Sequence, residues 1–375
     1  MTRWIPVSSP SFLGNERDYV AQCMDTTWVS SIGRFIGEFE SAFAHYVGSR
    51  HAIACNNGTT ALHAALLGAG IGPGDRVLVP SLTYIASANA ILYCGAEPVF
   101  VDSERDSWNL DLADAERKAD GAKAILPVHL YGRACRMDAL VDLCEAKSLV
   151  MIEDAAEGFG VRLDGRHVGT FGEMGTFSFF GNKVLTTGEG GMIVTNDDQL
   201  ARTLRQIKGQ GQDPDRRYWF PIVGYNYRMT NIQAAIGLAQ LESIHLHLND
   251  RARIAARYRD LLRDVPGVRL SSSDRHGEQS VCWLFSLVLE GCSRERRDEL
   301  IERLRLRGIE TRPFFYPTHH LPPYARWAEE ARCPVAEDLS RSGLSLPTWV
   351  GLPDEDMARI VELLSEELEG VRRAG

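Results

Sequence analysis

The chain has 375 residues, of which 44% are hydrophobic and 24% charged, with a formal net charge of −9. It has no run of about 18 apolar residues and no secretory leader, so we expect a cytoplasmic chain without a membrane span. The negative charge argues against a nucleic-acid partner, and the eight scattered cysteines, with no CxxC pair, indicate reduced thiols and predict no metal site.

The first 50 residues predict a loop over the site followed by a helix. From residue 51 to about 196, short β-branched runs alternate with helical patterns, which is typical of βαβ units around a mostly parallel sheet. The predicted strands span residues 51–55, 76–79, 98–102, 124–129, 149–153, 175–179 and 191–195. The predicted helices between them span residues 59–67, 84–93 and 137–146.

From Asn231 a long helical pattern, broken near residues 248–250, continues to about residue 262 and connects to a second unit. The pattern after it is α+β. It comprises an apolar run over 281–289, a helix over 294–306, a strand over 308–312 and a closing helix over 353–369. We therefore predict a large α/β domain over residues 1–240, whose N-terminal segment is partly a substrate loop, and a small α+β domain over residues 241–375.

Loops that follow the predicted strands are candidate site segments, because ligands of open α/β sheets lie at the carboxyl ends of the strands. The loop 56–60 (NNGTT) follows a strand and opens a helix, where amides and hydroxyls either hold a phosphate or only cap the helix. Asp154 also ends a strand. Its carboxylate could keep a heteroaromatic nitrogen protonated, and a helix cap or a metal ligand is the alternative.

Lysine is rare in this chain. Lys183 follows an apolar strand and lies in a turn flanked by glycines, where partial desolvation favours the neutral, nucleophilic amine. An isolated lysine is usually a solvated surface residue, but this setting favours a covalent cofactor site. Of the 41 basic residues, the lysines are Lys118, Lys123, Lys147, Lys183 and Lys208.

The polar, aromatic loop 224–231 precedes the connector helix. Asn226 and Arg228 could bind anionic groups there, and the alternative is that Thr230 or Asn231 only caps the helix.

Three histidines lie near the predicted site segments. His129 ends a predicted strand, and a buried, hydrogen-bonded histidine is the alternative to a site residue. We predict that His319 and His320 are surface loop residues.

Together these segments resemble the DegT-type sugar-nucleotide aminotransferases, a fold-type I pyridoxal phosphate family, from Trp28 to Pro313. The motifs WVSSIGRF (28–35), FFGNK (179–183) and TGEGG (187–191) resemble those of its GDP-perosamine synthase branch. The resemblance implies the fold-type I α/β architecture, pyridoxal 5'-phosphate as cofactor and glutamate as amino donor. It implies a nucleotide-linked 4-keto-6-deoxy sugar as acceptor, converted to a 4-amino-4,6-dideoxy sugar for a cell-surface polysaccharide such as O-antigen.

By this resemblance, Lys183 holds the cofactor covalently and then moves a proton between the substrate carbon and the cofactor. Asp154 pairs with the pyridinium nitrogen, and Tyr84 stacks on the ring unless it is only a core aromatic. Glu157 stands where many members carry glutamine near the phenolic oxygen of the cofactor, and a charged carboxylate there would oppose the phenolate.

The same resemblance implies an obligate homodimer with shared sites, because one phosphate ligand comes from the other subunit. The phosphate ligands are Gly58, Thr59, Ser178 and, from the other subunit, Asn226. Substrate contacts are expected in the motif 28–35 and in the segment 311–317. The predicted substrate-side residues are Ser30, Ser31, Arg34, Asn182, Arg228, Phe315 and Tyr316.

Some relatives replace the lysine with histidine and act as dehydratases, so the retained Lys183 favours transamination. An aminotransferase acting on a UDP- or dTDP-linked sugar, at C3, or on an aminocyclitol ketone is an alternative, as is a cofactor-binding regulator without turnover. A dinucleotide-dependent oxidoreductase is disfavoured, because no G-x-G-x-x-G joins a first strand to its helix.

Overall fold

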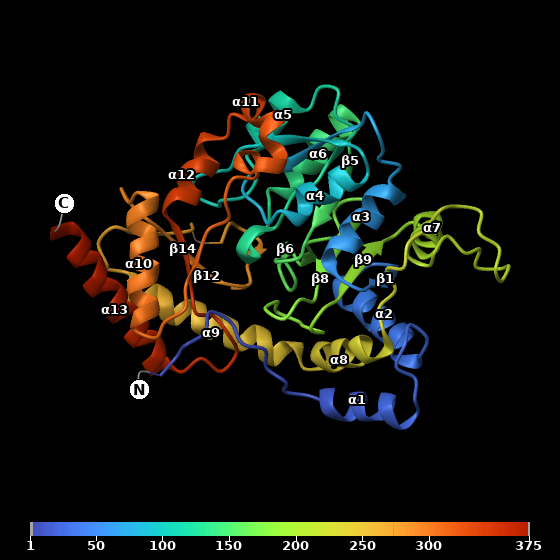
Figure 1. Ribbon diagram of the computed structural model, residues 1–375, viewed down its shortest axis with the longest axis horizontal. Helices are drawn as coiled ribbons and strands as arrows, with labels where there is room; N and C mark the ends of the chain where they lie inside the picture. Colours follow the sequence, from blue (N-terminus) through green and yellow to red (C-terminus); the bar gives the residue numbers. More distant parts are fainter. Residues whose placement is uncertain (1–2, 273, 374–375) are drawn as a thin grey trace.

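A seven-stranded, mostly parallel sheet forms the centre of the α/β part of the protein (Figure 1). The computed structural model describes residues 3–272 and 274–373. The strands follow the order β1-β9-β8-β5-β4-β2-β3, and β9 runs antiparallel to both of its neighbours while the other pairs are parallel. The bounds are β1 (His51–Cys55), β2 (Arg76–Pro80), β3 (Glu97–Val101), β4 (Ala124–Ile125), β5 (Val150–Asp154), β8 (Met174–Ser178) and β9 (Gly191–Thr195).

Helices pack against this sheet because their apolar residues recur on one face. Phe35, Phe39 and Phe43 lie four residues apart and are all buried. The side chain of Asn57 accepts a hydrogen bond from the N–H of Thr60 and so caps the helix that faces β8 and β9. The helices of this part are α2 (Arg34–Val47), α3 (Gly58–Gly68), α4 (Ala86–Tyr93), α5 (Leu112–Lys118), η1 (Leu130–Gly132), α6 (Met137–Lys147) and α7 (Asp198–Lys208).

The predicted α/β architecture is confirmed, and β1 and β9 have their predicted bounds. The strand predicted over 124–129 is wrong in length, since β4 ends at Ile125. Pro127 has no N–H to donate to a neighbouring strand, although its carbonyl still accepts from the N–H of Asp154. The chain therefore stays beside β5 without forming a regular ladder.

Two consecutive helices, α8 (Asn231–Glu242) and α9 (Ile244–Leu262), link the α/β part to the C-terminal part (Figure 1). The hydroxyl of Thr230 accepts from the N–H of Gln233, whose side chain accepts from the N–H of Thr230 in return. This capping box confirms that the loop before α8 caps the helix. An N-terminal helix, α1 (Glu16–Asp25), packs on α8.

The break between these helices lies at Ser243, not near residues 248–250 as predicted. The hydroxyl of Ser243 donates to the carbonyl of Ala239, which competes with the backbone bonding of the helix. Asp250 stays inside α9 because its carboxylate binds Arg253 at 2.6 Å, one helical turn away.

The C-terminal part contains an antiparallel sheet in the order β10-β12-β14-β13, with helices around it. A small sheet, β11-β6-β7, joins the two parts. The strands are β10 (Val268–Leu270), β12 (Phe285–Leu289), β13 (Arg312–Pro313), β14 (Gly343–Leu346), β11 (Glu278–Gln279), β6 (Arg162–Leu163) and β7 (Arg166–His167). The helices are α10 (Arg294–Leu306), η2 (Thr318–His320), η3 (Pro322–Trp327), α11 (Ala328–Ala331), α12 (Pro334–Ser342) and α13 (Asp354–Arg373).

The strand predicted over 308–312 is wrong in place, since only Arg312–Pro313 pairs with β14. The N–H of Ile5 donates to the carbonyl of Gly308, and the N–H of Glu310 donates to the carbonyl of Ile5. The N-terminal segment therefore occupies the backbone groups that a longer β13 would need.

Separate apolar cores lie in the two parts. One core fills the space between the C-terminal sheet and helices α9, α10 and α13, and it includes Ile5. The main core of the α/β part extends to Phe314, Tyr324 and Leu339. The division of the chain at residues 240 and 241 stays a prediction. Among the described residues, no helix is long and apolar enough to cross a membrane.

Candidate active site

A cavity of about 670 Å³ lies at the carboxyl ends of β5 and β8, where the C-terminal part meets the α/β part. Its size is typical of pockets that bind small molecules. The C-terminal part contributes Trp283, Arg312 and Ser345 to its wall. The predicted site residues that line it are Gly58, Thr59, Tyr84, Asp154, Glu157, Ser178, Asn182, Lys183 and Phe315.

Lys183 lies in the loop after β8, with its side chain 12% exposed. Its Nζ lies 3.9 Å from the centroid of the Trp283 ring and 3.8 Å from Oε1 of Glu157. Burial lowers the pKa of Lys183, although the nearby carboxylates oppose this shift. The site therefore favours a neutral, nucleophilic amine.

The other lysines each bind a carboxylate oxygen at 2.8 to 3.0 Å. Lys183 differs because its carboxylate partner is farther away and its surroundings are drier. The pairs are Lys118 with Asp114, Lys123 with Asp75, Lys147 with Asp120 and Lys208 with Glu40.

Asp154 is the last residue of β5 and is almost completely buried. Its Oδ2 accepts a hydrogen bond from the hydroxyl of Ser87 at 2.8 Å, and its Oδ1 accepts from the N–H of Ala156 at 3.0 Å. Burial nevertheless raises the pKa of Asp154. A cationic group in the cavity would keep this carboxylate ionised, so the site favours a protonated nitrogen beside it.

Glu157 is also buried, and its Oε2 accepts from the N–H of Tyr131 at 2.8 Å. Burial raises the pKa of Glu157 to about 7. The carboxyl group is thus protonated in a large fraction of molecules near neutral pH, which reduces the charge conflict with a phenolate. Tyr131 has a φ of 53°, a costly conformation for a non-glycine residue that directs its N–H to Glu157.

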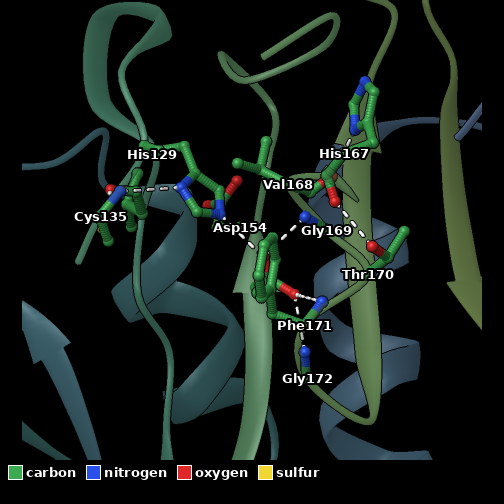
Figure 2. A network of polar contacts seen from close by, with 12 residues as sticks. His129, Cys135, Asp154, His167, Val168, Gly169, Thr170, Phe171 and Gly172 are labelled. Atoms are coloured by element: carbon green, nitrogen blue, oxygen red, sulfur yellow. Dashed lines mark hydrogen bonds and ion pairs between the residues drawn. The ribbon is translucent and has the colours of Figure 1, made fainter. Parts of the chain in front are cut away.

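A hydrogen-bond network behind the cavity fixes the end of β5 (Figure 2). The Nδ1 of the fully buried His129 accepts from the N–H of Cys135, so Nε2 carries the proton and donates to Oε2 of Glu153 at 3.0 Å. The alternative predicted for His129, a buried and hydrogen-bonded histidine, is confirmed. The Glu153 carboxylate also accepts from the N–H groups of Gly169, Phe171 and Gly172.

Hydrogen-bond donors gather at the end of the cavity where α3 begins. A Cβ atom on Gly58 would lie 2.8 Å from Cβ of Ser178, so a glycine is needed for α3 to approach the end of β8. The first N–H groups of α3 and the hydroxyls of Thr59 and Ser178 form this group of donors. A helix N-terminus with added hydroxyls binds phosphate.

Aromatic rings form one wall of the cavity. Tyr84 precedes α4, is 59% exposed and lies 5.7 Å from the ring of Phe315, so it is not a core aromatic. Tyr131 stacks on Phe315 with an interplanar angle of 9° and on Trp283 with one of 13°. This wall provides flat apolar surfaces for a planar ring.

Several predicted site residues do not line this cavity of the single chain. Arg34 binds Gln22 and Glu38 on the protein surface. Tyr316 is 48% exposed and lies beneath the guanidinium of Arg294. The roles assigned to these residues stay predictions. The residues outside the cavity wall are Ser30, Ser31, Arg34, Asn226, Arg228 and Tyr316.

Sequence reasoning missed Ser87, Tyr131 and Trp283 as site residues. Ser87 lies on α4, whose pattern gave no reason to choose it, yet its hydroxyl binds Asp154. Trp283 lies about 100 residues after Lys183, and no sequence signal links the two, although its indole N–H donates to the carbonyl of Asn182. Arg312 lies within the segment 311–317 that the sequence singled out.

The prediction that His319 is a surface loop residue is wrong. Its ring is 2% exposed on η2, and its Nδ1 lies 2.6 Å from Oγ of Ser81. The segment folds inward because the N–H of Thr318 also donates to the carbonyl of Ser81. His320 is exposed as predicted.

The cavity matches the chemical groups of pyridoxal 5'-phosphate. It offers donors for the phosphate at one end, an amine for the aldehyde at Lys183 and a carboxylate for the ring nitrogen at Asp154. The Oδ1 of Asn182 is buried and lacks a hydrogen-bond partner within the described part of the chain, so it can accept from a bound molecule. The residues present therefore fit this cofactor.

Comparisons with known proteins agree with this geometry. The sequence profile of the DegT/DnrJ/EryC1/StrS aminotransferase family matches residues 11–365. The chain is 54% identical to the GDP-perosamine synthase of Caulobacter vibrioides, over 97% of this chain and 98% of the relative. It is 46% identical to the GDP-perosamine synthase of Escherichia coli O157:H7, over the same shares of the two chains.

The structure is also similar to the PLP form of the putative sugar aminotransferase Spr1654 from Streptococcus pneumoniae. The TM-score is 0.93 at 27% sequence identity, and the match covers 98% of this chain and 99% of the other. Sequence and fold therefore agree over nearly the whole length. The chain belongs to the DegT/DnrJ/EryC1/StrS aminotransferase family.

Proposed function

We propose that this chain transfers the amino group of glutamate to the 4-keto group of a GDP-linked 4-keto-6-deoxy sugar, with pyridoxal 5'-phosphate as cofactor. The product is GDP-perosamine, a precursor of cell-surface polysaccharide. The observation that carries the proposal is the buried Lys183 amine, which shares one cavity with Asp154 and a donor-rich helix start. The two relatives named GDP-perosamine synthase support the choice of substrate.

The cofactor supplies an aldehyde that accepts the amine and a ring that stabilises negative charge on the adjacent carbon. With the cofactor bound, Nζ of Lys183 would take a proton from the donor carbon in the half-reaction with glutamate and would give a proton to the sugar carbon in the half-reaction with the keto sugar. Asp154 holds the proton on the ring nitrogen, and Ser87 fixes the orientation of the carboxylate. The ring of Trp283 covers Nζ and excludes water from it.

The remaining cavity residues bind and orient. Gly58, Thr59 and Ser178 hold the phosphate at the start of α3. In its protonated form, Glu157 donates to the phenolic oxygen. Asn182 and Phe315 contact the sugar substrate.

We also propose that the active enzyme is a homodimer in which Asn226 reaches the cofactor phosphate of the other subunit. Asn226 is exposed and lies outside the cavity of its own chain. The loop after α7 projects from the molecule (Figure 1). It exposes a group of large apolar side chains, which favours a covered surface in the assembled protein. The exposed residues are Tyr218, Trp219, Phe220, Ile222 and Val223.

A cytoplasmic location is part of this proposal. All eight cysteines are free, and six of them are buried, which suits a reducing compartment. The proposed domains are residues 1–240, which hold the cofactor, and residues 241–375, which supply Trp283 and Arg312.

The proposal is tested by following amino transfer with mass spectrometry. The purified protein, pyridoxal phosphate and glutamate are incubated with GDP-, dTDP- and UDP-linked 4-keto-6-deoxy sugars. We expect the GDP sugar to give the 4-amino product. Lys183→Arg keeps a long side chain but cannot bond to the aldehyde, so it should be inactive, while the surface control Lys147→Arg should retain full activity.

The outcomes separate the parts of the proposal. Amination of the dTDP or UDP sugar alone would refute the substrate and leave the role of Lys183 intact. Activity in Lys183→Arg would refute the mechanism.

A further inference from the structure

We propose that His319, His320 and Glu337 form a binding site for a divalent transition metal, with Zn²⁺ as the matching ion. The two histidines lie on η2, and Glu337 lies in the first turn of α12. None of the three lines the cofactor cavity. The cysteine spacing predicted no metal site, because these ligands come from segments that meet only in the folded chain.

The ligand atoms already lie at distances close to those of a metal site. Oε1 of Glu337 is 3.3 Å from Nε2 of His319 and 3.6 Å from Nε2 of His320. One ligand atom from each of the three residues can be chosen so that all lie within 4.8 Å of one another. Two ligands bound to Zn²⁺ at about 2.0–2.1 Å in tetrahedral geometry are roughly 3.3 Å apart. The two distances from Glu337 to the histidines are therefore already close to this spacing.

His319 is oriented in advance by its surroundings. Its Nδ1 is hydrogen-bonded to the hydroxyl of Ser81 at 2.6 Å, and its ring packs against Phe100. The N–H of Thr318 donates to the carbonyl of Ser81, which ties η2 to the end of β2. When Nδ1 donates to this hydroxyl, Nε2 is unprotonated and can bind a metal.

Protein closes one side of the cluster, and water reaches the other. The His319 side chain is 2% exposed, whereas those of His320 and Glu337 are 45% and 36% exposed. An ion can thus enter from solvent and keep water as its fourth ligand. Two imidazoles and one carboxylate suit zinc and its neighbours, whereas Mg²⁺ and Ca²⁺ prefer oxygen ligands alone.

The second histidine is what distinguishes this cluster from an ordinary hydrogen-bonded pair. A buried His319 needs one acceptor, and Glu337 satisfies it alone. His320 directs its Nε2 toward the same carboxylate oxygen although it could extend into water. The nearby cation Lys118 is neutralised by Asp114 at 2.8 Å, so its charge opposes a metal only weakly.

A bound metal would connect η2 with α12 and, through Ser81, with the segment that leads to Thr83 and Tyr84. It would therefore stiffen one wall of the cofactor cavity from outside. The existence of the site does not depend on the proposed transamination.

The test is isothermal titration of the EDTA-treated protein, prepared without an affinity tag, with ZnCl₂. We expect one ion per chain. The loss of one ligand in His320→Ala or Glu337→Gln should weaken binding at least about tenfold. His45→Ala, which removes an exposed histidine on α2, is the matched control and should bind as the unmodified chain does. Because His320 is exposed, its removal should leave the melting temperature of the zinc-free protein unchanged.

A second measurement identifies the geometry. Co²⁺ bound in a tetrahedral site gives intense visible absorption, and we expect this spectrum in the unmodified chain and its loss in both ligand variants. Zinc affinity that is equal in the unmodified chain and in His320→Ala would overturn the proposal, as would the absence of binding at micromolar zinc. An octahedral Co²⁺ spectrum would also contradict it.

Discussion

The buried carboxyl groups around β5 differ in the number of hydrogen bonds that they accept. Glu153 receives donors from His129 and three backbone N–H groups. Asp154 receives two donors, and Glu157 receives one backbone donor besides the nearby Lys183. For Asp154 and Glu157 these few donors oppose the effect of burial, which raises the pKa of both groups.

The hydrogen bond from Ser87 to Asp154 leads to a first prediction about single residues. Ser87→Ala removes a donor from a buried carboxylate, so the pKa of Asp154 should rise further and pyridoxal phosphate should bind about tenfold more weakly. Titration of the apoprotein with cofactor, followed by visible absorption, measures this affinity. Ser365→Ala, which removes a partly exposed hydroxyl on α13, is the control. Equal affinities for Ser87→Ala and the control would contradict the assigned role.

The burial of Glu157 leads to a second prediction, which concerns how the free energy of unfolding depends on pH. Its pKa rises from 4.5 to about 7 on burial, so its stabilising contribution is complete below pH 4.5 and is lost as the pH rises through 7. Relative to Glu157→Gln, the cofactor-free protein should lose at most about 3 kcal/mol of unfolding free energy between pH 5 and pH 8. Urea unfolding of both proteins at the two pH values measures the difference. Parallel pH profiles would show that Glu157 is ionised when the protein folds.

At the scale of elements, residues of the element itself determine some helix and strand boundaries, and contacts with other segments determine others. The bounds of β1, β9 and α10 follow from their own apolar and capping residues, and they match the predictions. The short β13 depends on bonds to a distant segment, the pairing of Ile5 with residues 308–310. A periodicity within one segment carries no information about such partners.

The packing of α8 on α2 makes a prediction with an internal control. A Cβ atom on Gly237 would lie 2.6 Å from the ring of Phe39, so Gly237→Ala should destabilise the protein by about 1–3 kcal/mol. A Cβ atom on Gly37, on the exposed side of α2, would meet no packed neighbour within 4 Å in the described part of the chain, so Gly37→Ala should stabilise by about 0.5–1 kcal/mol through its higher helix propensity. Chemical denaturation of both variants measures the opposite signs. Equal changes in stability would mean that the contact between residue 237 and Phe39 adjusts to the added methyl group.

At the scale of the whole molecule, the cavity combines residues that the sequence could identify with residues that it could not. Lys183 follows β8 and Asp154 ends β5, and the topology of an α/β sheet places ligands at these strand ends. Trp283 and Ser87 enter through the packing of α4 and the C-terminal part, which only the folded chain shows. The proposed second subunit would add a third source of site residues.

The shared site of the proposed dimer can be tested by complementation. Lys183→Ala and Asn226→Ala should each have little activity alone. Co-expression should restore about a quarter of the unmodified activity, because half of the dimers are mixed and each mixed dimer has one complete site. Activity measured with separately purified variants, kept unmixed, is the control. No recovery in verified mixed dimers would place Asn226 in the site of its own chain.

Lys183 has a more distant carboxylate partner than the other four lysines, which can therefore serve as internal references for its reactivity. Four of the five lysines lie within 3.0 Å of a carboxylate oxygen, whereas Lys183 lies 3.8 Å from Glu157 and burial lowers its pKa, so an amine-selective reagent at neutral pH should favour Lys183. Peptide mapping after stoichiometric labelling would therefore compare the labelling of Lys183 with that of four internal references. The labelled fraction of Lys183 would report how many chains in a preparation are competent, before any substrate is available.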